Sequence, residues 1–365
     1  FITKKAFILD IKLINKLEKR KLEGTIRSLY SFEDKIDFFS NDYLGLSKVK
    51  TPIYTKDIFG STGSRLISGS NKETELCERF IANFFDSEEA VVFNSGYDAN
   101  IGFFSAVPQK GDTVIYDEFI HASVRDGVRL SNSNSFSFKH NDLNDFKRKL
   151  KLAKGTIYVV IESIYSMDGD IAPLEEIGLI CRQFNAYLIV DEAHAIGVFG
   201  NDGKGLVKEA NIDYLVLARI VTFGKAFGSH GAAIICSAIL KDYLVNFARS
   251  FIYTTALPPE SYFRIRSIID NDYQNQRRLL NENITYFRKV FKEYNIQSNH
   301  TSPIQLIRFD SVDKINRLTQ SIQDLNIAIK PIFSPTVPKE SEGLRVCLHS
   351  FNKFSEIDLL KSAFL

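Results

Sequence analysis

Several features that mark specialised classes of protein are absent from this chain of 365 residues. No apolar run approaches the ~20 residues that a membrane-spanning helix needs, and no signal peptide is recognisable. The 46 basic and 44 acidic residues nearly balance, which argues against a dedicated nucleic-acid surface. The cysteines are far apart and form no CxxC pair, so neither a zinc knuckle nor a disulfide framework is expected: Cys77, Cys181, Cys236 and Cys347. We therefore expect a cytoplasmic protein without a metal site.

Three short signatures are also missing. The chain has no GxxxxGK(S/T) or GxGxxG pattern, which argues against a nucleotide cradle. It has no GxSxG elbow, which counts against a Ser-His-Asp hydrolase on an α/β sheet.

Instead, short apolar runs alternate with helical stretches through the first two thirds of the chain. The runs are rich in Val and Ile and bounded by polar residues, which is typical of buried strands in a mostly parallel sheet with helical crossovers. The expected strands are 90–93, 113–116, 157–161, 187–190, 214–217 and 232–236. Ligands bind beyond the carboxyl ends of such strands, where Asp191, Ser95-Gly96 and Glu162-Ser163 fall.

The pattern changes after Pro258-Pro259. A long helical stretch (260–294) leads into a small α+β unit, with strands expected at 304–309, 327–332 and 344–348 and helices near 312–325 and 354–364. Because 365 residues exceed one average domain, we expect three parts. These are an N-terminal helical segment (1–45), a large cofactor-binding domain (46–258) and a small C-terminal domain (259–365).

A lysine, a carboxylate and a histidine stand close together in this pattern. An apolar strand ends at Asp191, and His194 follows Asp191 by three residues. Lys225 lies about thirty residues further on, in a glycine-flanked turn. Taken singly, these are a solvated charge, a helix N-cap and a core histidine. Together they suit pyridoxal 5'-phosphate (PLP): the lysine forms an imine, and the carboxylate keeps the ring nitrogen protonated so that the ring is an electron sink.

Three further segments hold candidate residues. The segment 95–100 follows a strand and opens a helix, so it is either an anion site built from backbone N–H groups or an ordinary strand–helix turn. His121 is either a structural histidine or an imidazole that stacks on a planar cofactor. Ser166 offers a hydroxyl beyond a strand end, or is a turn serine.

Jointly, and in this order, the segments resemble the α-oxoamine synthases, a family within the aspartate-aminotransferase-like (fold type I) PLP enzymes. The resemblance covers nearly the whole chain. It rests on SNDYLGL (40–46), GSRLISG (63–69), SGY (95–97), SMDGD (166–170), DEAH (191–194), TFGK (222–225) and YTTALP (253–258). It implies an α/β fold: a large domain with a mostly parallel sheet flanked by helices, and a small α+β C-terminal domain.

The resemblance implies roles around the cofactor ring. Lys225 forms the imine and, with His121, is catalytic. Asp191 pairs with the pyridine nitrogen, His121 stacks on the ring, and Ser166 and His194 act near the ring hydroxyl.

At the phosphate, the resemblance implies that the amides of Gly96 and Tyr97 and the hydroxyl of Thr222 hold the anion. A threonine of the Thr254-Thr255 pair reaches the phosphate of the partner subunit's cofactor, so the active unit would be a homodimer with shared sites.

The resemblance also places the substrates. Arg345 matches the position that binds the amino-acid carboxylate, for which a guanidinium fork is suited. Arg27 and Thr336 match positions that face the acyl substrate, together with His121, and Asn41 lies near the bound amino acid.

The implied activity follows from one more segment. KPIFSPTVP (330–338), followed by LRV (344–346), is similar to the C-terminal signature of the biotin-pathway members. These condense L-alanine with pimeloyl-CoA, or a pimeloyl-carrier protein, to 8-amino-7-oxononanoate, CoA and CO2. Serine palmitoyltransferase and 2-amino-3-ketobutyrate CoA ligase share the mechanism with other substrates and stay alternatives, as does 5-aminolevulinate synthase.

The chain departs from the family in three places. Ala195 stands where many members have glycine, Ser229-His230 is less familiar, and the stretch 47–60 is shorter than usual. Some members are inactive partner subunits that have lost the lysine, and the presence of Lys225 argues against that interpretation here.

Overall fold

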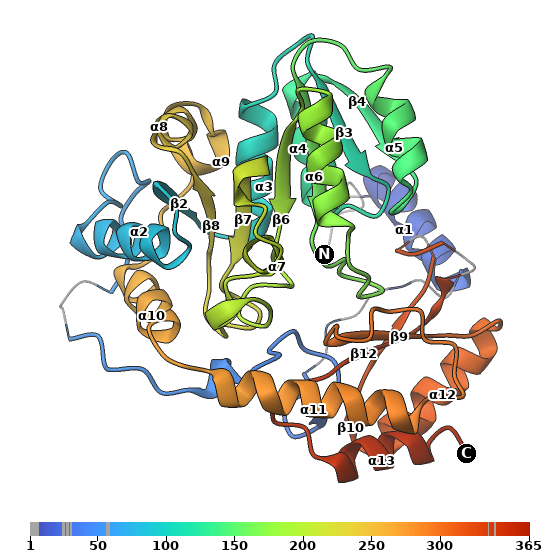
Figure 1. Cartoon of the computed structure of the whole chain (residues 1–365). Helices are drawn as coiled ribbons and strands as arrows, with labels where there is room; N and C mark the ends of the chain where they lie inside the picture. Colours follow the sequence, from blue (N-terminus) through green and yellow to red (C-terminus); the bar gives the residue numbers. More distant parts are fainter. Residues whose placement is uncertain are drawn as a thin grey trace.

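A computed structural model gives the structure of residues 7–23, 26, 29, 31–55, 59–334, 336–338 and 341–365, with side chains described from residue 11 onward. A seven-stranded sheet in the order β2-β8-β7-β6-β5-β3-β4 forms its centre (Figure 1). Strand β8 is antiparallel to both its neighbours, and the other neighbouring pairs are parallel. The strands are β2 (Glu89–Phe93), β3 (Thr113–Asp117), β4 (Asn134–Phe138), β5 (Ile157–Glu162), β6 (Tyr187–Asp191), β7 (Val216–Thr222) and β8 (Ala232–Cys236).

Helices connect these strands and cover both faces of the sheet. Side-chain caps fix several of their first turns; at α2, Asn71 accepts from the backbone of Glu73 and Thr74. The helices are α2 (Lys72–Phe84), α3 (Gly96–Ala106), α4 (Ala122–Ser131), α5 (Leu143–Leu150), α6 (Leu174–Gln183), α7 (Leu206–Glu209), α8 (Ala238–Phe247) and α9 (Arg249–Ile252). Helix α1 (Phe7–Leu22) precedes them, and its side chains from Ile11 onward are exposed.

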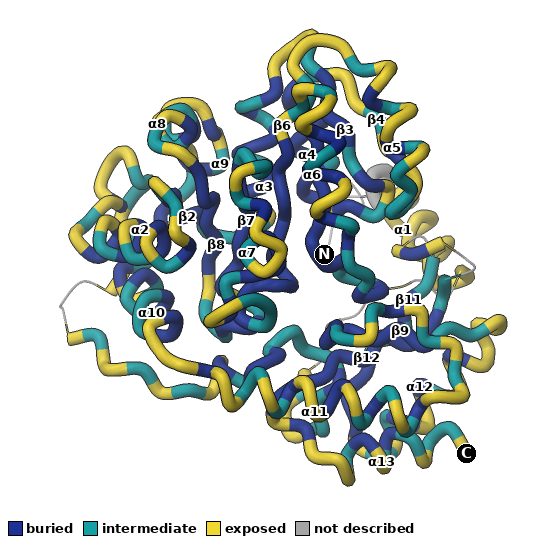
Figure 2. Tube along the Cα trace, in the orientation of Figure 1, coloured by how far each residue is buried: buried dark blue, intermediate teal, exposed yellow. Residues whose placement is uncertain are grey.

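Both faces of the central strands are buried, as the apolar runs in the sequence predict. Along β5, Val159 and Ile161 pack with α6, whereas Val160 packs with α3 and α4 in a separate core cluster. This alternation follows from the two-residue period of a strand. Figure 2 shows the central strands of the sheet buried along most of their length, and the outer turns of the helices exposed.

The C-terminal elements gather at one end of the molecule, below the large sheet in Figure 1. They contain the sheet β11-β12-β9 and, separately, β1 paired with β10. The elements at this end are β1 (Ile36–Asp37), α11 (Gln274–Val290), β9 (Ile304–Arg308), α12 (Val312–Asp324), β10 (Ile327–Ala328), β11 (Lys330–Ile332), β12 (Gly343–Cys347) and α13 (Phe354–Ser362). Helix α10 (Pro259–Ile269) instead packs against α2 beside the large sheet (Figure 1). The pairing of β1 with β10 attaches residues 36–37 to this end of the molecule. The division of the chain into three parts stays a proposal.

The structure corrects three of the expected elements and adds one strand. The expected strand 214–217 begins later, as β7, after a 3-10 turn over Asp213–Leu215. The expected helix 260–294 breaks at 270–273, where Asp and Asn side chains compete with the helical backbone. The expected strand 327–332 divides into β10 and β11, which belong to different sheets. Strand β4 was not expected, because its sequence NSFSF is polar and largely exposed at the sheet edge.

Within the described residues, no helix is long and apolar enough to cross a membrane. The same residues contain no cluster of three or more His, Cys, Asp or Glu side chains placed to hold a metal ion. All four cysteines are buried and unpaired.

Candidate active site

A cavity of about 350 Å³ opens at the carboxyl ends of the central strands. Strands β5, β6 and β7 end there with Glu162, Asp191 and Thr222. The cavity is lined by Asn41, Ser95, Gly96, Tyr97, Asn100, His121, Glu162, Asp191, Ala193, His194, Thr222, Gly224, Lys225, His230 and Gly231. The sheet therefore brings together eight of the residues proposed from the sequence: Asn41, Gly96, Tyr97, His121, Asp191, His194, Thr222 and Lys225.

The first turn of α3 and the end of β7 form one wall of this cavity. Ser95 caps the helix, accepting from the Asp98 backbone N–H and donating to the Asp98 carboxylate. A Cβ on Gly96 would lie 2.7 Å from Thr222 Cγ2, so glycine is what allows the helix start to approach β7 this closely. Free N–H groups at a helix start, beside a threonine hydroxyl, are suited to a phosphate.

Asp191 forms the floor of the cavity and is held by two donors. Its Oδ2 accepts from Asn100 Nδ2 at 2.9 Å, and its Oδ1 accepts from the Ala193 backbone N–H at 3.0 Å. Among the described residues no cation pairs with this carboxylate, which is 5% exposed. An oriented, buried carboxylate without a counterion is suited to a protonated ring nitrogen.

Lys225 projects from the tight turn after β7. The turn is closed by a bond from the Gly228 N–H to the Lys225 carbonyl at 2.8 Å, and Gly228 has the left-handed φ of 54°. A Cβ on Gly228 would lie 2.0 Å from the Ser47 nitrogen, so this position requires glycine. Burial lowers the pKa of the Lys225 amine, against the opposing effect of Asp191. A larger neutral fraction makes the amine a better nucleophile and base.

His121 begins α4 and lines the cavity. Its Nδ1 lies 2.7 Å from Ser123 Oγ, which fixes the orientation of the ring. Burial lowers the pKa of this imidazole, only partly opposed by Asp191. The ring is therefore largely neutral near pH 7, and its flat face can stack on an aromatic cofactor.

A buried polar chain connects His194 to the C-terminal part of the molecule. His194 Nδ1 lies 2.7 Å from the hydroxyl of Tyr43, which donates to Asn41 Oδ1 at 3.1 Å. Arg345 Nη2 donates to the same Asn41 oxygen at 3.0 Å. Burial lowers the pKa of His194 well below its usual range, so the histidine is a neutral member of this chain.

Arg345 lies behind the cavity lining rather than on it. Its Nε donates to the Ser166 carbonyl at 2.8 Å, and its Nη1 lies 2.8 Å from Cys347 Sγ. Arg345 is 6% exposed, and its guanidinium forms no ion pair with a carboxylate among the described residues. The guanidinium is therefore held in a fixed orientation with its charge uncompensated.

Ser166 and Thr336 lie in a second cavity of about 720 Å³, which shares His121 with the first. Arg125 and Asp168 also line it. Ser166 thus lies in the same cavity as Thr336, next to the cavity of the cofactor-type residues. His121 stands where the two cavities meet.

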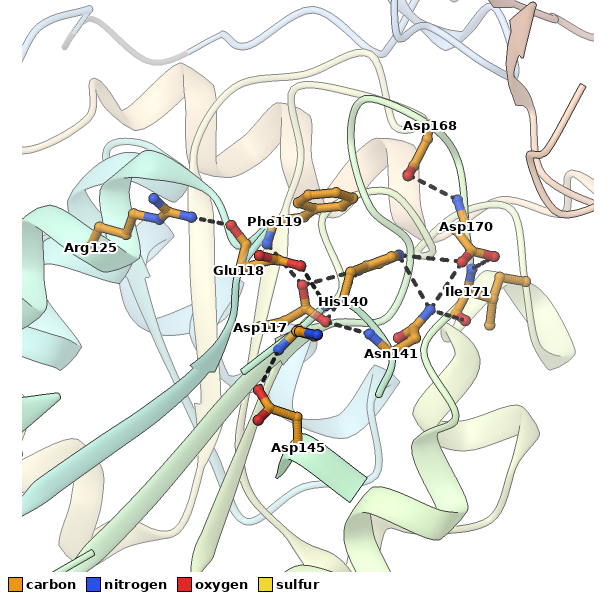
Figure 3. Close-up of polar contacts among 11 residues, drawn as sticks. Asp117, Glu118, Phe119, Arg125, His140, Asn141, Asp145, Asp168, Asp170 and Ile171 are labelled. Carbon is orange, nitrogen blue, oxygen red and sulfur yellow. Dashed lines mark hydrogen bonds and ion pairs between the residues drawn. The ribbon is translucent and has the colours of Figure 1, made fainter. Parts of the chain in front are cut away.

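A second polar cluster lies next to Phe119 and Tyr165, which line the second cavity (Figure 3). His140 Nδ1 lies 3.0 Å from Asp117 Oδ1, and its Nε2 lies 3.3 Å from Asp170 Oδ2. The ring stacks on Phe119 with centroids 4.5 Å apart, and the edge of Tyr165 meets it. Despite burial, the two carboxylates raise the pKa of His140 to about 10. The resulting imidazolium therefore connects two segments: the turn after Asp117, which leads to His121, and the loop that contains Ser166 and Asp170.

Thr254 and Thr255, like Arg345, line neither cavity. Asn94 Nδ2 donates to Thr254 Oγ1 at 3.2 Å and to the Thr255 carbonyl at 2.7 Å, next to the helix start that contains Gly96. Both threonines are thus beside the phosphate-type wall without lining it. Arg27 lies outside the described residues.

Sequence reasoning assigned no role to several residues of the site: Tyr43, Asn100, Glu162, Ala193 and Gly231. Asn100 had a usable signal, because it lies one helical turn after Gly96 and so faces the same side of α3. Tyr43 had none, since its contact with His194 joins positions 151 residues apart. His230, first noted as a departure from the family, lines the cavity.

Comparison with known proteins identifies the family. The model of the family described as "Aminotransferase class I and II" matches residues 33–356. An 8-amino-7-oxononanoate synthase of Emericella nidulans is 39% identical, over 88% of this chain and 87% of the relative. One of Lysinibacillus sphaericus is 37% identical, over 89% and 86%. This chain belongs to the α-oxoamine synthases of the class I and II aminotransferase family.

Solved structures confirm the expected fold. A serine palmitoyltransferase of Sphingomonas wittichii superposes with a TM-score of 0.86 at 25% identity, covering 98% of each chain. An 8-amino-7-oxononanoate synthase of Francisella tularensis superposes with a TM-score of 0.76 at 29% identity, covering 91% of this chain and 98% of that one. The fold is therefore that of the type I PLP enzymes.

Proposed function

We propose that this chain is a PLP-dependent C-acyltransferase that condenses L-alanine with a pimeloyl thioester, releasing 8-amino-7-oxononanoate, the thiol and CO2. One observation carries the proposal. A lysine with a lowered pKa, an oriented carboxylate without a counterion and a glycine-built helix start all face one cavity, beyond the ends of adjacent strands. The relatives named 8-amino-7-oxononanoate synthase indicate the substrates.

The residues fit PLP group by group. The wall of Gly96 and Thr222 suits its phosphate, Asp191 suits its ring nitrogen, and the Lys225 amine suits its aldehyde. When bound, PLP supplies the electron sink that permits removal of a proton from the Cα of the amino acid.

The chain's own residues supply the remaining functions. Lys225 Nζ holds the cofactor and, once released by the amino acid, takes the Cα proton, as its lowered pKa permits. Asp191 keeps the ring nitrogen protonated, and His121 covers the ring. His194 contributes a neutral, oriented imidazole near the ring hydroxyl.

The second cavity suits the acyl donor. It adjoins the first at His121 and contains Thr336, which the family resemblance places at the acyl group. Arg345 binds the amino-acid carboxylate. Asn41, which accepts a hydrogen bond from the guanidinium, lies near the bound amino acid. We propose that Ser166 acts mainly through its carbonyl, which orients Arg345.

The assembly and location expected from the sequence remain part of the proposal. We propose a homodimer, as the family resemblance implies, and Thr254 and Thr255 lie beside the phosphate-type wall, as that role requires. We propose a cytoplasmic location. The donor is either CoA or a carrier protein.

Thiol release by the cofactor-loaded protein tests this function. L-Alanine with pimeloyl-CoA is compared with serine–palmitoyl-CoA, glycine–acetyl-CoA and glycine–succinyl-CoA. We expect turnover with the alanine–pimeloyl pair alone. Turnover confined to another pair would reject the proposed substrates and move the chain to a sister activity.

A further inference from the structure

Glu162 is a buried acid in the main cavity that the proposed mechanism leaves without a role. It is the last residue of β5, is 3% exposed and lines the cavity. Its backbone partner across the sheet is Asp191, so the two side chains extend from neighbouring strands in register. Neighbouring strands are only about 5 Å apart, which places two carboxyl groups side by side on the cavity floor.

The two acids differ in their hydrogen bonds. Asp191 accepts from Asn100 Nδ2 and from the Ala193 backbone N–H, both of which stabilise an ionised carboxylate. Glu162 Oε1 is buried without a hydrogen-bond partner, and within the described residues no cation forms an ion pair with Glu162. The structure thus provides for one negative charge at this place.

We propose that Glu162 is a positioning residue of the PLP site. It remains a neutral carboxylic acid, leaves Asp191 as the single carboxylate on the cavity floor, and offers its O–H as a hydrogen-bond donor to the cavity. Two adjacent buried carboxyl groups do not ionise together, and the one with better donors keeps the charge. The inference rests on the proposed function, because it assumes that this cavity binds PLP.

The surroundings of Glu162 agree with this assignment. Burial and the Asp191 charge raise its pKa well above the usual range. Lys225 and the His121 backbone oppose them, and Asp117, at the end of β3, adds to them. The balance favours the protonated acid.

The neutral state has a consequence for the lysine. An ionised Glu162 would raise the pKa of the Lys225 amine, as Asp191 does. With Glu162 protonated, the lysine feels one carboxylate instead of two. Its amine therefore keeps the low pKa that a nucleophile and base requires.

Glu162→Gln tests the inference, because glutamine keeps the shape, the neutrality and a donor. Glu162→Leu removes the polar group, and Glu175→Gln removes an exposed carboxylate of α6 as a matched control. The apoprotein is examined by infrared spectroscopy for the carbonyl stretch of a protonated carboxylic acid. The holoenzyme is titrated with pH while the visible absorbance of the lysine-bound cofactor is followed.

Near pH 7 we expect the infrared band in the wild type and in Glu175→Gln, and its loss in Glu162→Gln. Glu162→Gln is expected to keep the midpoint of the absorbance titration and to keep turnover within about 3-fold. Glu162→Leu is expected to lose about 10-fold or more in turnover, because leucine cannot donate a hydrogen bond into the cavity. An ionised Glu162 would instead show no such band, and its replacement by glutamine would lower the absorbance midpoint. Either of these results would overturn the inference. Both spectroscopic readings stand even if no thioester is turned over, so failure of the proposed substrates remains distinguishable.

Discussion

Arg345→Lys separates the geometry of the amino-acid site from its charge. The guanidinium is fixed by the Ser166 carbonyl at 2.8 Å, Cys347 Sγ at 2.8 Å and Asn41 Oδ1 at 3.0 Å. A lysine keeps the charge but has a single nitrogen, so it cannot hold these partners and also present a two-pronged face to a carboxylate. Loss of one charge-assisted hydrogen bond costs about 1.5–3 kcal/mol, which is roughly a 10- to 150-fold weakening.

We therefore expect the KM for L-alanine to rise roughly 10- to 100-fold in Arg345→Lys. The KM for pimeloyl-CoA and the absorbance of the bound cofactor should change little. Steady-state thiol release, with each substrate varied while the other is saturating, measures the split. A KM increase confined to pimeloyl-CoA would show that Arg345 serves the acyl donor, and an unchanged alanine KM would refute its role altogether.

Three further predictions concern the cofactor wall, the cavity floor and the second cluster. Gly96→Ala places a Cβ 2.7 Å from Thr222 Cγ2 and should weaken PLP binding about 10-fold by spectroscopic titration; adding Thr222→Ser, which deletes that methyl, should restore most of it. Asn100→Leu removes a donor from ionised Asp191 and should weaken PLP binding about 10-fold or more, and unchanged affinity would contradict the assigned role. His140 has a pKa raised to about 10, so its stabilising effect is complete below the unfolded pKa of about 6.5 and is lost as pH rises through 10. The thermal midpoint of the wild type should thus fall more steeply between pH 7 and 10 than that of His140→Gln, and parallel curves would count against the imidazolium.

The parts of the fold that the sequence predicts are those with a local pattern. Buried strands such as Ile157–Glu162 read as continuous apolar runs, and β5, β6 and β7 each end with a polar residue that lines the cavity. Strand Asn134–Phe138 escapes prediction because an edge strand half in solvent has no apolar run to mark it. The break after Ile269 is similarly weak in sequence, since helix propensity alone does not decide where one helix stops.

Within the site, the same distinction separates predicted from unpredicted residues. Lys225 and Asp191 are identified by their own chemistry and by the motifs around them. Tyr43 meets His194 only through a contact between distant parts of the chain, which no local pattern encodes. Asn41 was expected in the site, but its contact with Arg345 is likewise known only from the fold. Glu162 was placed at the correct edge of the sheet, yet its pairing with Asp191 needs the strand register.

The most direct test of the account is the fate of the alanine carboxyl group. The holoenzyme is supplied with L-alanine labelled at that carbon and with pimeloyl-CoA, and labelled CO2, CoA and the aminoketone are measured together, with Lys225→Ala as the control. The account predicts equal amounts of the three products, the mass of 8-amino-7-oxononanoate, and none of them from Lys225→Ala. Thiol release without labelled CO2, or full turnover by Lys225→Ala, would contradict it.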